Sequence, residues 1–205
     1  MGADVRKELE KELLTGLKAI TSSFVGLKAS KNKIVLLDGV KRVGEIYIHY
    51  LTRADGYYAG LEISECDAME FCLLQSPPYN SRLLNSSFLS KTSLSERDKE
   101  FGDEFGGIIR MPAPSEMNLT ARKIEHRLTR FYLSRAENCL TGSLLVINDV
   151  LLSPDDYAFP FLTVLFAAKK NGLTLKDERF QRVLNVNNIF GNKKFDLALA
   201  DKILT

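Results

Sequence analysis

Two Asp-Gly pairs, Asp38-Gly39 and Asp55-Gly56, separate three runs that are rich in β-branched and aromatic residues, and these pairs constrain the fold more than any other feature. An Asp-Gly pair between such runs is typical of a tight hairpin turn, because the turn needs positive φ angles that glycine adopts without strain. The pattern therefore predicts a three-stranded antiparallel meander over residues 33–63.

The middle strand of this meander is predicted to have one core face and one face of polar and aromatic side chains. Since successive side chains of a strand point to opposite faces, Ile46 and Ile48 share the core face. Tyr47 and His49 then lie on the second face, where Tyr58 of the next strand can join them. Amphipathic aromatic side chains suit a protein interface, although the three are simply core if the C-terminal helices cover that face.

Segments on both sides of the meander complete a first predicted unit over residues 1–141. Apolar residues recur every three or four positions from Val5 to Phe24, which predicts an amphipathic helix. A second long helix is predicted to begin with Ser115 as its cap and to end near Leu140, before Gly142. Residues 68–74 fit a strand or a short helix, residues 76–105 predict a long surface loop, and residues 106–111 predict a returning strand.

Residues 142–205 are predicted to form a helical extension packed on that unit. The apolar run 143–152 is of uncertain type, whereas Ser153-Pro154 is a good helix start and Asn171-Gly172 a good stop. Two short helical patterns follow at 175–184 and 195–203. The sequence thus predicts an α+β fold, an antiparallel β-meander packed with helices, plus this C-terminal helical extension.

Composition and cysteine usage predict a cytoplasmic protein. The first residues are charged and lack the apolar core of a secretory signal, and the most apolar stretch, 157–168, is shorter than the roughly 20 residues of a spanning helix. Three scattered cysteines argue against a disulfide framework. A net charge of only +2 gives no general signature of nucleic-acid binding.

The candidates for catalysis are weak. Cys66 lies between Glu65 and Asp67, whose carboxylates are expected to raise its pKa, so a small buried cysteine is the preferred interpretation. No spacing of Cys or His fits a metal site, and no cofactor is predicted. The alternative is a small enzyme with dispersed residues, among which His49, Cys66 and nearby carboxylates are the candidates.

A basic stripe on the long helix is the second candidate surface. Lys123, Arg127 and Arg130 fall at positions i, i+4 and i+7. Such a stripe can contact phosphates, as in a regulator that binds nucleic acid, or an acidic protein. Charges that only keep a helix face solvated are the more common explanation, and nucleic acid is therefore the less favoured partner.

The order of helix, three-stranded meander, variable segment, a strand ending in Arg110-Met111-Pro112 and a long helix from Ser115 resembles the small chaperones of type III secretion, over about residues 5–141. The resemblance implies an α/β sandwich, commonly dimeric, that holds a segment of a secreted protein. This chain is longer and less acidic than those chaperones. The leading hypothesis is therefore a non-enzymatic protein-binding domain, such as a secretion chaperone or adaptor, with another protein or a second copy of the chain as its partner.

Overall fold

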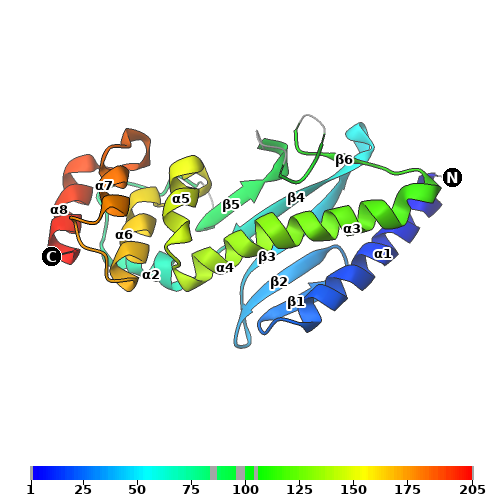
Figure 1. Cartoon of the computed structure of the whole chain (residues 1–205), viewed down its shortest axis with the longest axis horizontal. Coiled ribbons are helices and arrows are strands. Elements are labelled where there is room, and N and C mark those ends of the chain that lie inside the picture. Colours follow the sequence, from blue (N-terminus) through cyan, green and yellow to red (C-terminus); the bar gives the residue numbers. More distant parts are fainter. Residues whose placement is uncertain (1, 84–86, 96–99, 104–105, 205) are drawn as a thin grey trace. The chain divides into compact units, whose positions relative to one another are not determined.

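The computed structural model describes residues 2–83, 87–95, 100–103 and 106–204, and the structural statements below refer to these residues. The predicted α+β class is confirmed, because helices pack with one antiparallel sheet (Figure 1). The chain divides into two units: unit 1 contains residues 1–62 and 91–134, and unit 2 contains residues 63–90 and 135–205. None of the described helices is both long enough and apolar enough to cross a membrane.

The predicted meander is present, with one additional strand before it. The strands follow in the order β1 (Leu27–Ser30), β2 (Lys33–Asp38), β3 (Lys41–Leu51) and β4 (Gly56–Ile63). The two predicted turns hold positive φ angles, +58° at Gly39 and +44° at Asp55. Lys33 pairs with Tyr47 and Ile34 with Ile46, so the alternation along β3 continues across the sheet.

Two further strands join the sheet beside β4. They are β5 (Leu89–Thr92) and β6 (Ile109–Arg110), and β6 pairs Arg110 with Gly56. β6 confirms the predicted returning strand. β5, however, lies inside the predicted loop 76–105, so that prediction was wrong for these four residues; positions 84–86, 96–99 and 104–105 of the loop lie outside the described residues.

Two helical segments cover one face of the sheet in unit 1. They are α1 (Gly2–Ser22) and α3 (Met117–Arg127), which continues into a π-helical turn, η4 (Leu128–Leu133). α1 buries Leu9, Leu13 and Leu17 completely. The Arg6 guanidinium lies 4.5 Å from the centroid of the Tyr50 ring, which shows that α1 covers the face shared with Ile46 and Ile48.

The predicted cap of the second long helix was wrong. Ser115 lies within a short 3-10 turn, η3 (Pro114–Glu116), and α3 begins after Glu116 without a side-chain cap. The predicted end of this helical run is confirmed. It closes with α4 (Ser134–Thr141) in unit 2, followed by Gly142 at a φ of +62°.

Unit 2 is a helical bundle. Besides α4 it contains α2 (Asp67–Leu74), α5 (Leu145–Leu152), α6 (Pro160–Lys170), α7 (Glu178–Leu184) and α8 (Lys193–Ile203). α6 is almost entirely buried, and α2, α5 and α8 pack against it. Residues 68–74 are therefore helical, and 143–152 are mostly helical. The predicted helix start at Ser153-Pro154 is corrected, because residues 154–156 form only a 3-10 turn, η5, and α6 begins at Pro160.

The two units are interleaved in sequence. The prediction assigned residues 1–141 to one unit and 142–205 to an extension. In the structure, residues 63–90 and 135–141 instead group with the C-terminal helices. The chain therefore enters unit 2 twice, first between β4 and β5 and again at the beginning of α4.

Candidate protein-binding face

The sheet face opposite α1 carries the three aromatic side chains that the sequence singled out. We call Tyr47, His49 and Tyr58 the aromatic face. The ring centroids of Tyr47 and His49 are 4.6 Å apart, those of His49 and Tyr58 5.6 Å, and those of Tyr47 and Tyr58 6.3 Å. His49 is exposed and both tyrosines are half-buried. The structure thus brings the three residues together on a face that α1 and α3 leave uncovered.

The Tyr47 ring packs against Gly60 of β4, a contact that was not predicted from the sequence. A Cβ atom at Gly60 would lie only 2.1 Å from Cζ of Tyr47, so the ring lies directly over the glycine backbone. A glycine inside a strand often marks such a close approach, and this signal was available in the sequence. The close approach of Gly60 thus fixes where the Tyr47 ring lies on this face.

Charges of both signs lie next to the aromatic face. Glu45 forms ion pairs with Lys33 at 2.8 Å and with Arg42 at 2.6 Å. Burial, followed by the Glu62 carboxylate and by Tyr58 and Glu45, raises the pKa of Tyr47 to about 12. Tyr47 therefore remains a neutral phenol at physiological pH, which can stack or form hydrogen bonds but is a poor general base.

His49 and Tyr58 are coupled by a polar contact as well as by ring packing. Nδ1 of His49 lies 3.3 Å from the Tyr58 hydroxyl oxygen, and the two ring planes are nearly perpendicular. An edge-to-face pair of this kind is a favourable aromatic geometry. The contact orients both side chains at the exposed end of the aromatic face.

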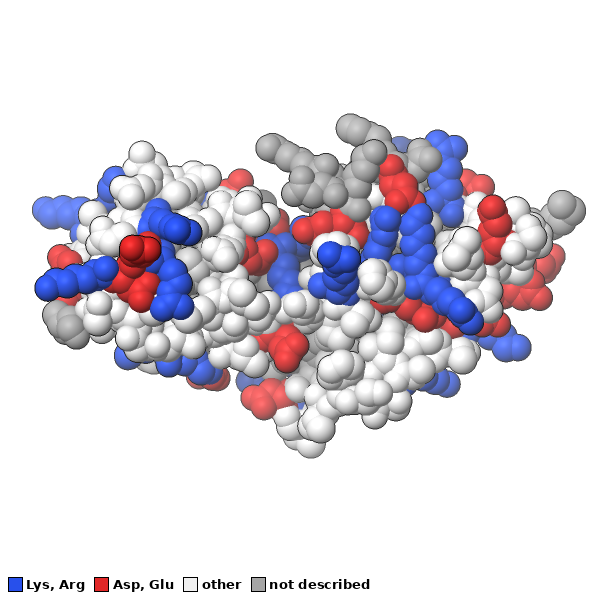
Figure 2. Space-filling model, viewed as in Figure 1, with Lys and Arg blue, Asp and Glu red and all other residues white. Residues whose placement is uncertain are grey.

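The basic stripe is largely engaged within unit 1. Lys123 and Arg127 both bind the Asp103 carboxylate, the latter at 2.6 Å, and Arg127 also donates to the Phe101 carbonyl oxygen at 2.5 Å. The Arg130 guanidinium lies over the Phe131 ring, 5.2 Å from its centroid. On the face shown in Figure 2, several blue side chains lie close together over the region of α3, with red side chains beside them. Two of the three stripe residues therefore anchor the segment at 101–103.

A depression beside the stripe is small for a substrate site. It has a volume of about 210 Å³ and is lined by residues of the 103–112 segment and of α3, among them Arg110 and Lys123. Sites for small molecules usually measure about 300–1,000 Å³. The depression therefore gives little support to the enzyme alternative.

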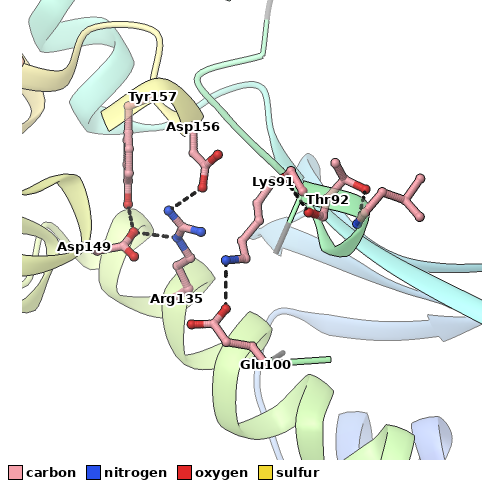
Figure 3. A network of polar contacts seen from close by, with 9 residues as sticks. Lys91, Thr92, Glu100, Arg135, Asp149, Asp156 and Tyr157 are labelled. Carbon is pink, nitrogen blue, oxygen red and sulfur yellow. Dashed lines mark hydrogen bonds and ion pairs between the residues drawn. The ribbon is translucent and has the colours of Figure 1, made fainter. Parts of the chain in front are cut away.

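Unit 2 contains a buried charge network that the sequence did not reveal (Figure 3). The Arg135 guanidinium binds Asp149 at 2.5 Å and Asp156 at 2.9 Å, and the Tyr157 hydroxyl donates to the same Asp149 oxygen. Arg135 is only 8% exposed. A buried guanidinium needs such partners, so the network is explained by folding alone. Figure 3 also draws the Lys91–Glu100 ion pair of unit 1.

The residues of the enzyme alternative are divided between the units. His49 belongs to unit 1 and Cys66 to unit 2. Among the described residues, no group of three or more His, Cys, Asp or Glu side chains is arranged to hold a metal ion. Cys66 is half-buried rather than buried, and its pKa is lowered overall, chiefly by the neighbouring Cys139 side chain, although Asp67 acts to raise it as expected.

Comparisons with known proteins give no further indication of function. Scans against protein-family models, curated proteins and solved structures each found no match to this chain. The functional argument therefore rests on the geometry of the chain itself.

Proposed function

We propose that this chain is a non-enzymatic protein-binding domain that holds a segment of another protein on the aromatic face, as a cytoplasmic secretion chaperone or adaptor does. The observation that carries the proposal is the assembly of Tyr47, His49 and Tyr58 on a sheet face that the helices of unit 1 leave uncovered. Antiparallel sheets commonly leave one face to solvent, and polar side chains usually occupy it. Three contiguous rings there favour a contact surface.

The chemistry of the face favours a partner segment with apolar side chains flanked by Lys or Arg. Tyrosine ring faces are electronegative and attract cations. The Glu62 carboxylate adds negative charge beside Tyr47 and, after burial, contributes to the raised pKa of its phenol, whereas Glu45 is paired with Lys33 and Arg42. A basic side chain of the partner can stack on one tyrosine ring while the adjacent apolar side chains of the partner cover the other rings of the aromatic face.

The two alternatives are less well supported. A regulator that contacts nucleic acid needs free cations, whereas Lys123 and Arg127 bind Asp103. For an enzyme built on His49 and Cys66, the contacts given for His49 are with Tyr47 and Tyr58, and none of them involves Cys66. Binding of a protein segment, in contrast, requires only the aromatic face, whose three side chains already lie together.

The test is affinity capture of tagged protein from its native cytosol, followed by mass spectrometry and sizing. The informative variant is the double substitution His49→Thr with Tyr58→Thr, because threonine suits a strand and removes both rings. We expect one stoichiometric partner with the unmodified chain. The double variant should bind it at least about tenfold more weakly, since aromatic residues that anchor an interface contribute more than 1 kcal/mol each.

Phe24→Thr is the matched control, because Phe24 is 48% exposed but lies in the turn after α1. This variant should retain the partner. Equal retention by the double variant would contradict the proposal. Recovery of nucleic acid with a steep dependence on salt would support the basic stripe instead. If the chain forms a homodimer and the double variant still forms it, self-association uses a surface other than the aromatic face.

A further inference from the structure

Two turns of unit 1 project apolar side chains into solvent. Val25 lies in the turn between α1 and β1, and Val40 lies in the turn between β2 and β3. Both valines are fully exposed, at 104% and 101%, and Phe24 beside Val25 is 48% exposed. We call Phe24, Val25 and Val40 the apolar tip.

The two turns lie side by side at one end of the sheet (Figure 1). The Leu37 N–H group donates a hydrogen bond to the Gly26 carbonyl oxygen at 2.7 Å, so the pairing of β1 with β2 continues one residue into the first turn. Val25 therefore lies next to the end of β2, where the turn that contains Val40 begins. Because neighbouring strands are only about 4.8 Å apart, the two valines belong to one surface.

Folding alone does not explain the apolar tip. Turns are usually polar, and a fully exposed valine removes no apolar surface from water when the chain folds. Single exposed apolar residues are common on protein surfaces. Several of them at one place, however, are typical of a surface that contacts a protein or a membrane.

The shape of the apolar tip favours a membrane surface. Both valines project from turns, and their complete exposure shows that neighbouring residues do not enclose them in a groove. A protein partner would need a pocket of matching shape for each projecting side chain. A bilayer interface needs no such match, since elements bound there bury their apolar side about 5–10 Å deep among the headgroups and acyl chains.

The charges around the apolar tip are mainly basic. Lys28 follows the first turn, Lys41 and Arg42 follow the second, and all three side chains are exposed. The acidic side chains nearby are Asp38, at the end of β2, and Glu45, which forms an ion pair with Arg42 at 2.6 Å. Three basic groups thus outnumber two acidic ones, and anionic lipid headgroups attract such a surface.

We propose that the apolar tip binds the surface of an anionic lipid bilayer. Val25, Val40 and Phe24 enter the interface, while the basic side chains that follow the two turns lie among the headgroups. Binding of this kind requires no membrane-spanning helix. The inference goes beyond the proposed binding of a protein segment, because the apolar tip and the aromatic face are different surfaces. Phe24→Thr should therefore retain the protein partner and weaken binding to lipid.

The first experiment measures insertion with a single fluorophore in the full chain. The chain contains no tryptophan, so Val40→Trp provides a unique reporter at the apolar tip. When vesicles of phosphatidylcholine and phosphatidylserine are added, its emission should shift to shorter wavelength, and lipids with brominated acyl chains should quench it. The matched control is Leu152→Trp, at an 84% exposed position of α5, and it should show neither effect. Equal responses of the two reporters would contradict the proposal.

The second experiment measures binding of the chain without a reporter by co-sedimentation with the same vesicles. The double variant Val25→Asp with Val40→Asp should bind at least about tenfold more weakly than the unmodified chain. The matched control, Leu119→Asp with Leu152→Asp, adds the same charge at exposed positions of α3 and α5 and should bind more tightly than the tip variant. Circular dichroism checks that each variant is folded.

The lipid composition and the salt concentration test the charges. Binding should weaken on vesicles of phosphatidylcholine alone and at high salt, because both changes reduce the attraction between basic side chains and headgroups. Equal binding to both kinds of vesicle would contradict the role of the basic side chains. Failure of the unmodified chain to sediment with anionic vesicles at low salt would overturn the proposal. Unchanged binding of the tip variant would overturn it as well.

Discussion

Replacing Arg135 with methionine is expected to destabilise unit 2 strongly. Methionine keeps most of the apolar stem of the side chain and removes the guanidinium. Asp149 and Asp156 then lose the counter-charge that binds them at 2.5 Å and 2.9 Å. Removing one partner of a buried ion pair leaves an uncompensated charge, which usually costs about 3–5 kcal/mol.

The partners of Arg135 set the expected magnitude at the lower end of that range. The Asp149 and Asp156 side chains are 28% and 22% exposed, so water can still solvate them in part. We therefore expect a loss of about 3 kcal/mol, which corresponds to an increase of about 150-fold in the equilibrium constant for unfolding. Adding Asp149→Asn and Asp156→Asn to the variant removes the orphaned charges, and stability should return to within about 1 kcal/mol.

The assay is urea unfolding followed by circular dichroism, with hydrogen exchange of the α6 amides as a readout that belongs to unit 2 alone. The local readout is needed because two units need not unfold in a single transition. A loss below about 1 kcal/mol for Arg135→Met would refute the assigned role of the network. Failure of the triple variant to recover stability would show that Arg135 acts through its packing instead.

Three further substitutions test features outside this network. Buried Asp196 accepts hydrogen bonds from the Tyr79 hydroxyl and two backbone amides, yet desolvation raises its pKa above 3.8. Because the folded state then binds the proton more tightly than the unfolded state, the free energy of unfolding should fall as the pH rises from 3.8 through the raised pKa. Urea titrations at several pH values should show this fall, and Asp196→Asn should make it smaller. Gly60→Ala should displace the Tyr47 ring into solvent and change the free energy of unfolding by less than about 1 kcal/mol. Solvent perturbation of tyrosine absorbance should then detect one more exposed ring. Gly142→Ala should cost about 1–3 kcal/mol in urea unfolding, because φ is +62° there and the added Cβ would lie 2.7 Å from the Phe166 ring.

Local signals in the sequence predicted the features that depend on neighbouring residues. The Asp38-Gly39 turn and the alternation along β3 were sufficient to bring Tyr47 and His49 to one face, because turn chemistry and strand period act within a few residues. Gly142 ended its helix as predicted for the same reason.

Features that depend on distant partners were missed. β5 joins the sheet beside β4, and its Leu89 also forms a bridge with Tyr157, which no local pattern indicates. That bridge holds Tyr157 in an extended conformation, so the turn at Pro154 cannot continue into α6.

Interleaving of the two units determines the order in which the chain can fold during synthesis. When residues 63–90 leave the ribosome, the helices that complete unit 2 have not yet been made, and residues 1–62 still lack α3. Because domains generally fold as units during translation, neither unit can close before the chain has passed residue 91. Unit 1 can finish once residue 134 emerges, whereas α2 must wait for α6. In a nascent chain of this protein, the apolar sides of α1 and α2 therefore both stay exposed until distant segments are made, up to residue 134 for α1 and up to the end of α6 at Lys170 for α2.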